Sequence, residues 1–240
     1  MKKYFKKIVV FLSQVLVVQI NRKFIRYVTV RELLINDSVK SSANYAAKYM
    51  KLAMMFEERS ELWDFCIEIA RNKTIKSSKK KAVLEFGVLR GQSLNYFAKS
   101  LPEAKIFGFD SFEGLDENWT GNNLPKGAFN LGGKTPLVLD NVELIKGRVQ
   151  KTMPDFLPRI NNLDIALIHF DMDTYTPTKF VLDSLMPWLK PETIVIFDEY
   201  FGYRSWENHE FKAWKQICKK AKLKYEYLAF TNTQVGLLIT

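Results

Sequence analysis

Cysteine is scarce in this chain of 240 residues. The two cysteines, Cys66 and Cys218, lie in stretches with a helical pattern, and neither belongs to a CxxC pair or a Cys/His cluster. Because thiolate-bound zinc sites and disulfide scaffolds need such clusters, the sequence argues against both. Free cysteines are typical of a reducing compartment, so we expect a cytoplasmic protein.

Long apolar runs are also missing. The N-terminal run from Ile8 to Ile20 has about 13 residues, where a membrane-spanning helix needs roughly 20. No cleavage site of small residues follows it, so the run is not typical of a signal peptide. Two interpretations remain open: a helix that docks on the protein or forms a homodimer, and a peripheral helix on the inner face of an anionic membrane.

Acidic residues are absent before Glu32, whereas seven basic residues lie among the first 26. The rest of the chain carries 29 basic and 26 acidic residues and is nearly neutral, although the whole chain has a formal charge of +10. The positive charge therefore belongs to an N-terminal arm and does not indicate a surface specific for nucleic acid. Residues 1–26 are the segment through which we expect either peripheral membrane contact or dimer formation.

Apolar residues at helical spacing follow between residues 31 and 74, for example Tyr45, Tyr49 and Leu62. A polar, basic stretch, residues 72–81, then separates these helices from the remaining chain. We therefore expect an N-terminal helical arm, residues 1–74, and a main domain, residues 75–240.

From residue 82 onward, short apolar runs alternate with helical patterns, which is typical of a parallel α/β sheet. The expected strands cover residues 82–86, 105–109, 142–145, 165–170 and 193–197, with helices at 93–101, 153–160 and 179–189. After a helix at 206–221, a few residues join two last strands, 225–230 and 234–239, which must form an antiparallel hairpin. We expect a Rossmann-like α/β fold: a mostly parallel sheet with this hairpin and extra N-terminal helices.

The chain contains no GxGxxG motif, the fingerprint of dinucleotide-binding folds. The turn after the strand at 82–86 has two glycines, Gly87 and Gly91, and Leu89 replaces the glycine that would approach a pyrophosphate. Glycine lets a backbone approach a ligand, and the start of the next helix offers free N–H groups. The turn therefore indicates a nucleotide-sized ligand against Gly87 and Gly91, while the missing glycine disfavours NAD.

Asp110 ends the second strand of this pattern, 23 residues after Gly87. An acidic side chain at this place can accept hydrogen bonds from both hydroxyls of a ribose. A turn aspartate that caps the backbone before Ser111 is the alternative. Because that alternative does not explain why Asp110 occurs together with Glu85, we expect Asp110 and Ser111 to contact the cofactor.

Three acids follow later strands: Asp171 ends one, and Asp198 and Glu199 end the next. The carboxyl ends of parallel strands meet at one edge, where ligands of open α/β sheets bind. Converging carboxylates without a lysine repel one another unless a cation lies among them, and oxygen ligands favour Mg²⁺. The sequence thus predicts a Mg²⁺ site, with simple strand-end turns as the alternative. Asp173, two residues after Asp171, is expected to act as general base or to bind the acceptor.

The chain resembles the macrocin O-methyltransferase family and its bacterial relatives in four segments: EFGVLRGQS, FGFDSFEGL, LIHFDMDTYTPTK and IVIFDEYFGYRSWENHEFKAW. The resemblance covers roughly residues 80–240. It implies that residues 75–240 form a class I methyltransferase domain that binds S-adenosylmethionine. A parallel sheet that ends in an antiparallel hairpin is the layout of that class rather than of NAD dehydrogenases.

The resemblance also implies roles for single residues. In small-molecule O-methyltransferases, residues matching Glu85 and Gly87 line the cofactor, and the serine matching Ser93 holds its carboxylate. The acid matching Asp110 binds the ribose hydroxyls. Gln150 falls where such proteins contact the adenine.

For the acids, the resemblance implies metal binding. In metal-dependent relatives, residues matching Asp171, Asp198 and Glu199 ligate Mg²⁺, which brings two substrate hydroxyls into place. Glu199 departs from the commoner Asp or Asn at its position, so the metal requirement stays open. Asp171 is expected to contact the cofactor and to take part in catalysis as well.

The two histidines differ in their surroundings. His169 lies in an apolar strand, where a hydrogen-bonded core residue is expected. His209, in the segment WENHEFKAW, is expected either to cap a helix or to contact the acceptor as a catalytic residue.

The segment of residues 116–136 is long, rich in glycine and proline, and without periodicity. Loops of this length are usually lids or disordered, so we expect it to close over the acceptor. Tyr203, Arg204 and Trp206 are expected to form a platform on the opposite side of the acceptor, or to pack against this loop.

These features predict an S-adenosylmethionine-dependent O-methyltransferase. Its acceptor is expected to be a hydroxyl of a polar small molecule or glycan sugar, with Mg²⁺ assisting, as in natural-product or polysaccharide modification. Two alternatives remain: an NAD-linked oxidoreductase, and a non-catalytic scaffold of methyltransferase fold that the basic arm recruits.

Overall fold

The computed structural model describes residues 9–13, 28–73 and 79–240. The chain divides into two compact units, Met1–Asp37 and Ser38–Thr240, with the boundary inside helix α2 (Val30–Tyr49). Of the run Ile8 to Ile20, only residues 9–13 are described, and they are helical; its expected role lies outside the described residues. None of the described helices has the length and apolar character needed to cross a membrane.

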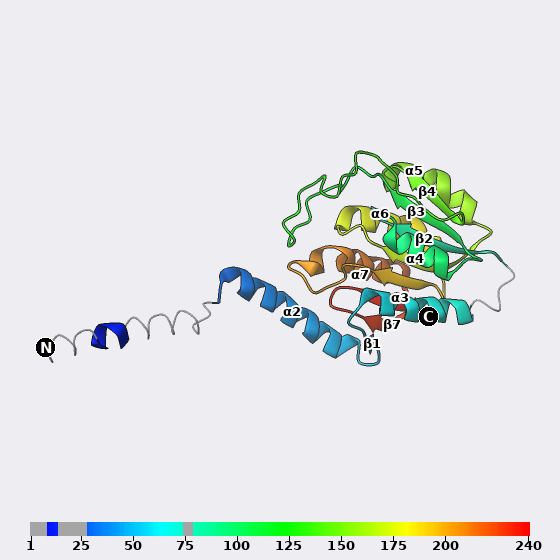
Figure 1. Ribbon diagram of the computed structural model, residues 1–240. Helices are drawn as coiled ribbons and strands as arrows, with labels where there is room; N and C mark the ends of the chain where they lie inside the picture. Colours follow the sequence, from blue (N-terminus) through cyan, green and yellow to red (C-terminus); the bar gives the residue numbers. More distant parts are fainter. Residues whose placement is uncertain (1–8, 14–27, 74–78) are drawn as a thin grey trace. The chain divides into compact units, whose positions relative to one another are not determined.

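The second unit is built on an eight-stranded sheet with the order β1-β7-β8-β6-β5-β2-β3-β4 (Figure 1). The strands are β1 (Met54–Met55), β2 (Lys81–Phe86), β3 (Lys105–Asp110), β4 (Val142–Lys146), β5 (Asp164–Phe170), β6 (Ile194–Phe197), β7 (Tyr225–Phe230) and β8 (Val235–Ile239). Only β8 runs antiparallel to its neighbours, β6 and β7. The expected Rossmann-like fold class, with its C-terminal hairpin, is confirmed.

Helices cover both faces of the sheet. Those of one face are α3 (Arg59–Lys73) and α4 (Gln92–Ser100), and those of the other are α5 (Val149–Phe156), α6 (Tyr175–Leu185) and α7 (Glu210–Ala221). Alternate residues of β2 serve the two layers, since Val83 packs beneath α3 and α4 while Leu84 and Phe86 face the other helices. A strand buried on both faces is uniformly apolar, which is why the short apolar runs identified the strands.

The seven strands expected after residue 81 are present within one residue of their predicted ends. Helices α5 and α6 each begin four residues earlier than expected. In α6 the earlier start places Pro177 in the first turn, where a missing N–H costs no intrahelical hydrogen bond. Strand β1 was not expected, because two residues are too few to show the alternation of apolar and polar residues that marks a strand.

β1 joins the N-terminal segment to the sheet edge, since Met54 and Met55 pair in parallel with β7. Helix α3 also belongs to the sheet domain, because its residues Leu62 and Cys66 are fully buried against the sheet. The domain boundary expected at residue 74 stays a prediction, while the compact units divide earlier in the chain.

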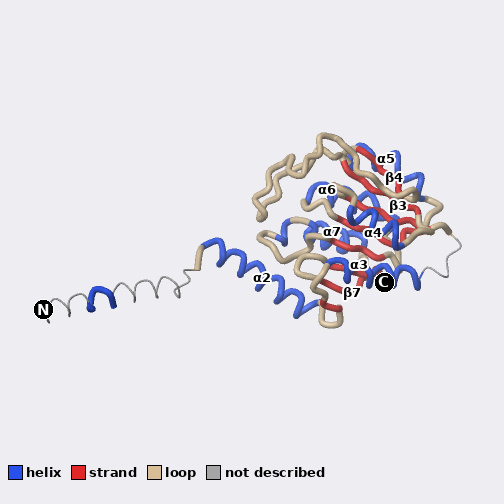
Figure 2. The backbone as a smooth tube through the Cα atoms, in the orientation of Figure 1, coloured by secondary structure: helices blue, strands red, loops and turns tan. Residues whose placement is uncertain are grey.

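The connection between β3 and β4 is a long loop, drawn in tan in Figure 2. Its own backbone hydrogen bonds hold it, for example from Leu115 N to Ala128 O at 2.9 Å, and Trp119 bridges to Leu124. The loop also packs closely on residues 203–206, since a Cβ at Gly121 would lie 1.7 Å from the Arg204 carbonyl oxygen. The segment expected as a lid is therefore a folded loop that contacts the rest of the domain.

Candidate active site

The carboxyl ends of four parallel strands form one edge of the sheet. Four phenylalanines pair across neighbouring strands in the order Phe109, Phe86, Phe170 and Phe197. The residues that follow them are, in the same order, Asp110, Gly87, Asp171 and Asp198. The sheet register therefore places these predicted site residues side by side, as their strand-end positions indicated.

Gly87 allows two strand ends to approach closely. Its N–H donates to the Phe109 carbonyl at 2.9 Å, and its φ is +91°. A Cβ at this position would lie 1.8 Å from the Asp171 carbonyl oxygen. No other residue fits there without displacing the backbone.

The replacement Gly87→Ala is expected to lower the free energy of unfolding by at least about 3 kcal/mol, because its Cβ meets the backbone of β5. Gly127→Ala is the matched control: its φ is +83°, but no atom lies within 4 Å of the added Cβ. At Gly127 the strained backbone alone is expected to lower the free energy of unfolding by about 1 kcal/mol. Urea unfolding measures both, and equal losses would contradict the steric explanation.

Asp110 supports the glycine turn with both carboxylate oxygens. Oδ2 accepts from the backbone N–H groups of Val88 and Leu89 at 2.9 and 2.8 Å, and Oδ1 accepts from Phe112 N at 2.7 Å. Leu89 has a φ of +49°, which is unfavourable for a leucine. Because each carboxylate oxygen has two lone pairs, Asp110 can hold this turn and still accept from a ligand.

A cavity of about 340 Å³ opens at this edge. Its size lies in the range of small-ligand sites, roughly 300–1,000 Å³. The predicted site residues that line it are Gly87, Asp110, Ser111, Asp171, Asp173, Asp198 and Glu199. Trp119 and Phe129, from the loop that the sequence predicted to lie over the acceptor, also line it, as do Arg59 and Arg148, which the sequence did not indicate.

The remaining predicted residues do not line this cavity: Glu85, Gly91, Ser93, Gln150 and His209. Gly91 is the N-cap residue of α4, with a φ of +73°, and Gln150 donates to Asp116 Oδ2 at 3.2 Å. His209 precedes α7 without a side-chain cap, and its Nε2 contacts the Thr120 carbonyl oxygen at 3.0 Å. His209 thus joins the long loop to α7, and the roles expected for these residues stay predictions.

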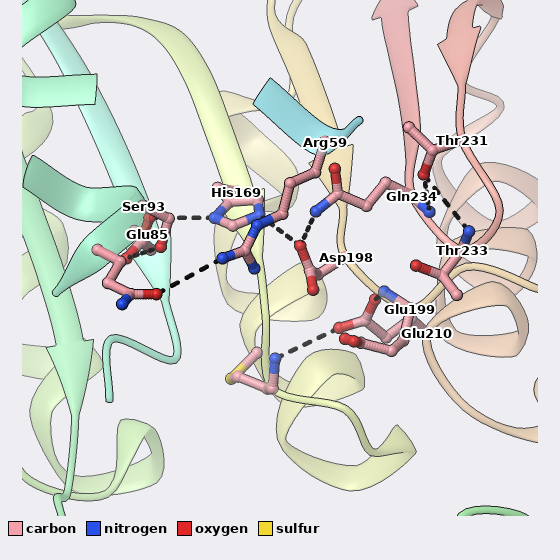
Figure 3. Close-up of polar contacts among 12 residues, drawn as sticks. Arg59, Glu85, Ser93, His169, Asp198, Glu199, Glu210, Thr231, Thr233 and Gln234 are labelled. Atoms are coloured by element: carbon pink, nitrogen blue, oxygen red, sulfur yellow. Dashed lines mark hydrogen bonds and ion pairs between the residues drawn. The ribbon is translucent and has the colours of Figure 1, made fainter. Parts of the chain in front are cut away.

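Glu85 is fully buried beneath the cavity, next to His169 (Figure 3). Ser93 donates to Glu85 Oε1 at 3.1 Å, and His169 Nδ1 lies 3.0 Å from Glu85 Oε2. On its other side, His169 Nε2 lies 3.6 Å from Asp198 Oδ1. His169 therefore bridges two buried carboxylates, so the expectation of a partnered core residue is confirmed.

Opposite charges stabilise the contacts of His169 with Glu85 and Asp198. Although burial opposes ionisation of His169, the carboxylates of Asp198 and Glu85 raise its pKa to about 10. Burial likewise opposes ionisation of Asp198, but the contact with His169 holds the Asp198 pKa below its ordinary value. Both ring nitrogens of His169 thus lie near carboxylates, Nδ1 at hydrogen-bond distance from Glu85 and Nε2 3.6 Å from Asp198.

Replacing His169 with leucine is expected to lower the free energy of unfolding by about 3–5 kcal/mol, because it leaves two buried carboxylates without a counter-charge. The double variant Glu85→Gln with His169→Leu should recover part of this loss, since one carboxylate is neutralised. Urea unfolding of the single and double variants checks this. Additive losses would show that the two residues act independently.

Asp171, Asp173 and Glu199 form a second group at the cavity. One carboxylate oxygen from each lies within 4.8 Å of the others, and Glu199 Oε2 is buried without a hydrogen-bond partner. Burial, followed by the charge of Asp198, raises the pKa of Asp171 and of Glu199 well above their ordinary values. An all-oxygen group with an unpartnered oxygen fits a hard divalent cation such as Mg²⁺.

The predicted metal set of Asp171, Asp198 and Glu199 stays a prediction. Asp198 lies beside this group, but its Oδ1 accepts from the Gln234 side-chain amide and faces His169 (Figure 3). Asp173 takes the place in this group that the sequence assigned to Asp198. Asp198 belongs instead to an overlapping group with His169 and Asp171, whose possible ligand atoms also lie within 4.8 Å of one another. Burial raises the pKa of Asp173 to about 7, and its φ is +63°.

Glu210 is a buried acid that sequence reasoning missed. Its Oε1 accepts from Met172 N at 3.4 Å and its Oε2 from Glu199 N at 3.2 Å. Glu210 thereby ties the chain after β5 to the chain after β6, directly behind the acid group. In the sequence, Glu210 was marked only by its position in the segment WENHEFKAW, directly after His209, to which a site role was assigned instead.

The expected acceptor platform lies elsewhere. Tyr203 and Trp206 are buried and do not line the cavity. Trp206 donates to Ser41 Oγ at 3.0 Å, and Tyr203 packs edge-on against Trp119 of the long loop. The alternative expectation, packing against the loop, is confirmed for Tyr203. From the loop itself, Trp119 and the half-exposed Phe129 reach the cavity.

Comparison with known proteins finds a family match over part of the domain. A model described as a methyltransferase domain matches residues 84–200, which contain the glycine turn and the acids at the strand ends. Among curated proteins, none matches the sequence.

Solved structures share the fold. The calicheamicin methyltransferase CalS11 has 22% identity and a TM-score of 0.58, over 90% of this chain and 95% of its own. Apo CalS11, described as a TDP-rhamnose 3′-O-methyltransferase, has 22% identity and a TM-score of 0.52, over 90% and 97%. A Staphylococcus aureus protein provisionally named as a caffeoyl-CoA O-methyltransferase has 14% identity and a TM-score of 0.50, over 95% and 100%.

The sheet order, the single antiparallel strand and the family match agree with one another. The specific resemblance to the macrocin family stays a prediction. Residues 84–200 thus match a methyltransferase domain, and the sheet around them has the fold of class I S-adenosylmethionine-dependent methyltransferases.

Proposed function

We propose that the protein transfers a methyl group from S-adenosylmethionine to a hydroxyl of a polar small molecule or sugar, assisted by a divalent metal. The observation that carries this proposal is one cavity lined both by Asp110, which suits a ribose, and by Asp171, Asp173 and Glu199, which suit a metal and an acceptor. A site of this kind can hold the methyl donor and a hydroxyl acceptor together.

The cofactor side is formed by the glycine turn. Asp110 would accept from the ribose hydroxyls while keeping its bonds to Val88 and Leu89. Gly87 keeps this part of the wall free of side chains, which allows the donor to lie against the backbone. These residues bind and orient the donor, and alignment is the main requirement of a methyl transfer.

The acceptor side is formed by the acids and the long loop. Asp173 lines the cavity, and its carboxylate would take the proton from the attacking hydroxyl. Phe129 and Trp119 supply apolar surface, which suits the face of a sugar or another ring and excludes water from the reacting atoms.

A metal bound through one oxygen each of Asp171, Asp173 and Glu199 would offset their mutual repulsion and supply a positive charge that lowers the pKa of an acceptor hydroxyl. The second oxygen of Asp173 would remain free to take the proton. Glu210 would hold Glu199 in place through the Glu199 backbone. Asp198, charged through His169, would lie beside this group.

The choice of a sugar or a natural-product precursor follows the structural neighbours. CalS11 is described as a TDP-rhamnose 3′-O-methyltransferase of calicheamicin biosynthesis and shares the fold at 22% identity. The cavity itself selects only a polar acceptor with a hydroxyl next to an apolar ring face.

The test uses the full chain with S-adenosylmethionine and Mg²⁺ and a panel of free sugars, nucleotide sugars and catechols. Mass spectrometry should find an acceptor that gains one methyl group, with S-adenosylhomocysteine formed in equal amount and the reaction suppressed by chelator. Folded protein that does not bind S-adenosylhomocysteine in calorimetry would overturn the proposal. Cofactor binding without methyl transfer to any acceptor would favour the scaffold alternative.

A further inference from the structure

Arg59 reaches the cavity from outside the part of the chain that matches the methyltransferase family. It is the first residue of α3, whereas the match begins at residue 84. Its side chain is exposed and belongs to the cavity lining, and Figure 3 shows it among the polar side chains at this edge of the sheet. Neither its position nor its neighbours in the sequence indicated a role in the site.

Arg59 brings a positive charge to a cavity whose other charged lining residues, apart from Arg148, are all acids. The other cation in the lining, Arg148, is engaged by the Asp116 carboxylate and lies 3.6 Å from Glu113 Oε2. Among residues 9–13, 28–73 and 79–240, no carboxylate forms an ion pair with Arg59. Its guanidinium can therefore receive an anionic group from a ligand.

The guanidinium is held in position by two neutral contacts. Its Cζ lies 5.1 Å from the centre of the buried Trp63 ring, and Nη2 donates to Gln92 Oε1 at 3.5 Å. Gln92 begins α4, directly after the glycine turn. A cation at the start of α3 opposes the helix dipole, so helix stability does not explain the arginine.

We propose that Arg59 binds the carboxylate of the methionine part of the cofactor. This inference rests on the proposed binding of S-adenosylmethionine. That part of the cofactor carries one ammonium and one carboxylate: the acids at the strand ends suit the ammonium, and the carboxylate needs a cation. Arginine matches a carboxylate with two parallel N–H groups, and Arg59 lines the same cavity as the proposed ribose ligand, Asp110.

The experiment compares two ligands that differ only in this carboxylate: S-adenosylhomocysteine and its decarboxylated form, S-adenosyl-3-thiopropylamine. Isothermal titration calorimetry measures both with the wild-type chain and with Arg59→Gln. We expect Arg59→Gln to weaken S-adenosylhomocysteine binding by about tenfold or more, and to leave the decarboxylated ligand within about twofold.

The matched control is Arg71→Gln, an arginine at the far end of the same helix that does not line the cavity. It should bind both ligands like the wild type. Unchanged binding of S-adenosylhomocysteine by Arg59→Gln would overturn the inference and leave the proposed function intact, as for an arginine that serves a phosphate of the acceptor. An equal loss for both ligands would also overturn it, because it indicates a structural role. Failure of the wild type to bind S-adenosylhomocysteine would instead refute the proposed function.

Discussion

The variant Asp110→Ala is expected to weaken S-adenosylhomocysteine binding by about 100-fold or more. A hydrogen bond from a ribose hydroxyl to a charged acceptor is lost, worth about 1.5–3 kcal/mol. The variant also frees the N–H groups of Val88 and Leu89, which shape the turn that the donor lies against. Isothermal titration calorimetry measures the affinity.

Asp155→Ala, on the exposed surface of α5, removes an equal charge away from the cavity and serves as control. It should bind like the wild type. Thermal unfolding of Asp110→Ala without ligand shows whether the domain remains folded. If the folded variant retained wild-type affinity, Asp110 would be only a turn residue, and the cofactor would have to lie elsewhere in the cavity.

The variant Asp173→Asn is expected to lower kcat by about 1,000-fold, since general-base catalysis contributes roughly 100- to 10,000-fold. Asparagine matches aspartate in shape and tolerates the left-handed backbone, which matters because Asp173 has a φ of +63°. The change therefore removes the carboxylate with little strain. Initial rates of methyl transfer at saturating S-adenosylmethionine and acceptor measure the effect.

Cofactor affinity provides the comparison for this variant. If Asp173 acts on the acceptor, S-adenosylhomocysteine should bind within about threefold of the wild type while turnover is lost. Asp140→Asn, an exposed aspartate before β4, controls for the loss of one negative charge. Wild-type turnover by Asp173→Asn would exclude Asp173 as the base.

The positions of Asp110, Asp171 and Asp198 at one edge could be predicted because each follows an apolar strand of the same parallel sheet. Strands buried on both faces appear in the sequence as short apolar runs, and the carboxyl ends of parallel strands lie at the same edge of the sheet. The residue types then restricted the chemistry to a ribose ligand and a hard metal. The hairpin was equally readable, because a few residues between two strands allow only antiparallel pairing.

The partners of these side chains could not be read in the same way. Glu85 and Ser93 stand next to the glycine turn in the sequence, yet the Ser93 side chain donates to Glu85, and Glu85 contacts His169 beneath the cavity. Strand residues alternate between faces, and the contact of His169 with Asp198 of another strand depends on register. Local sequence contains neither piece of information.

The sequence was sufficient to predict the methyltransferase fold, because the spacing of apolar residues and the positions of strand ends are local properties of the polypeptide. The roles proposed for Arg59 and Glu210, and the place of Asp173 in the acid group, needed the folded molecule. Arg59 reaches the cavity because α3 packs beside α4. Glu210 is buried behind the acid group because its carboxylate accepts from backbone N–H groups after two different strands. Such contacts join residues far apart in the chain, so their energies appear only once the tertiary structure has formed.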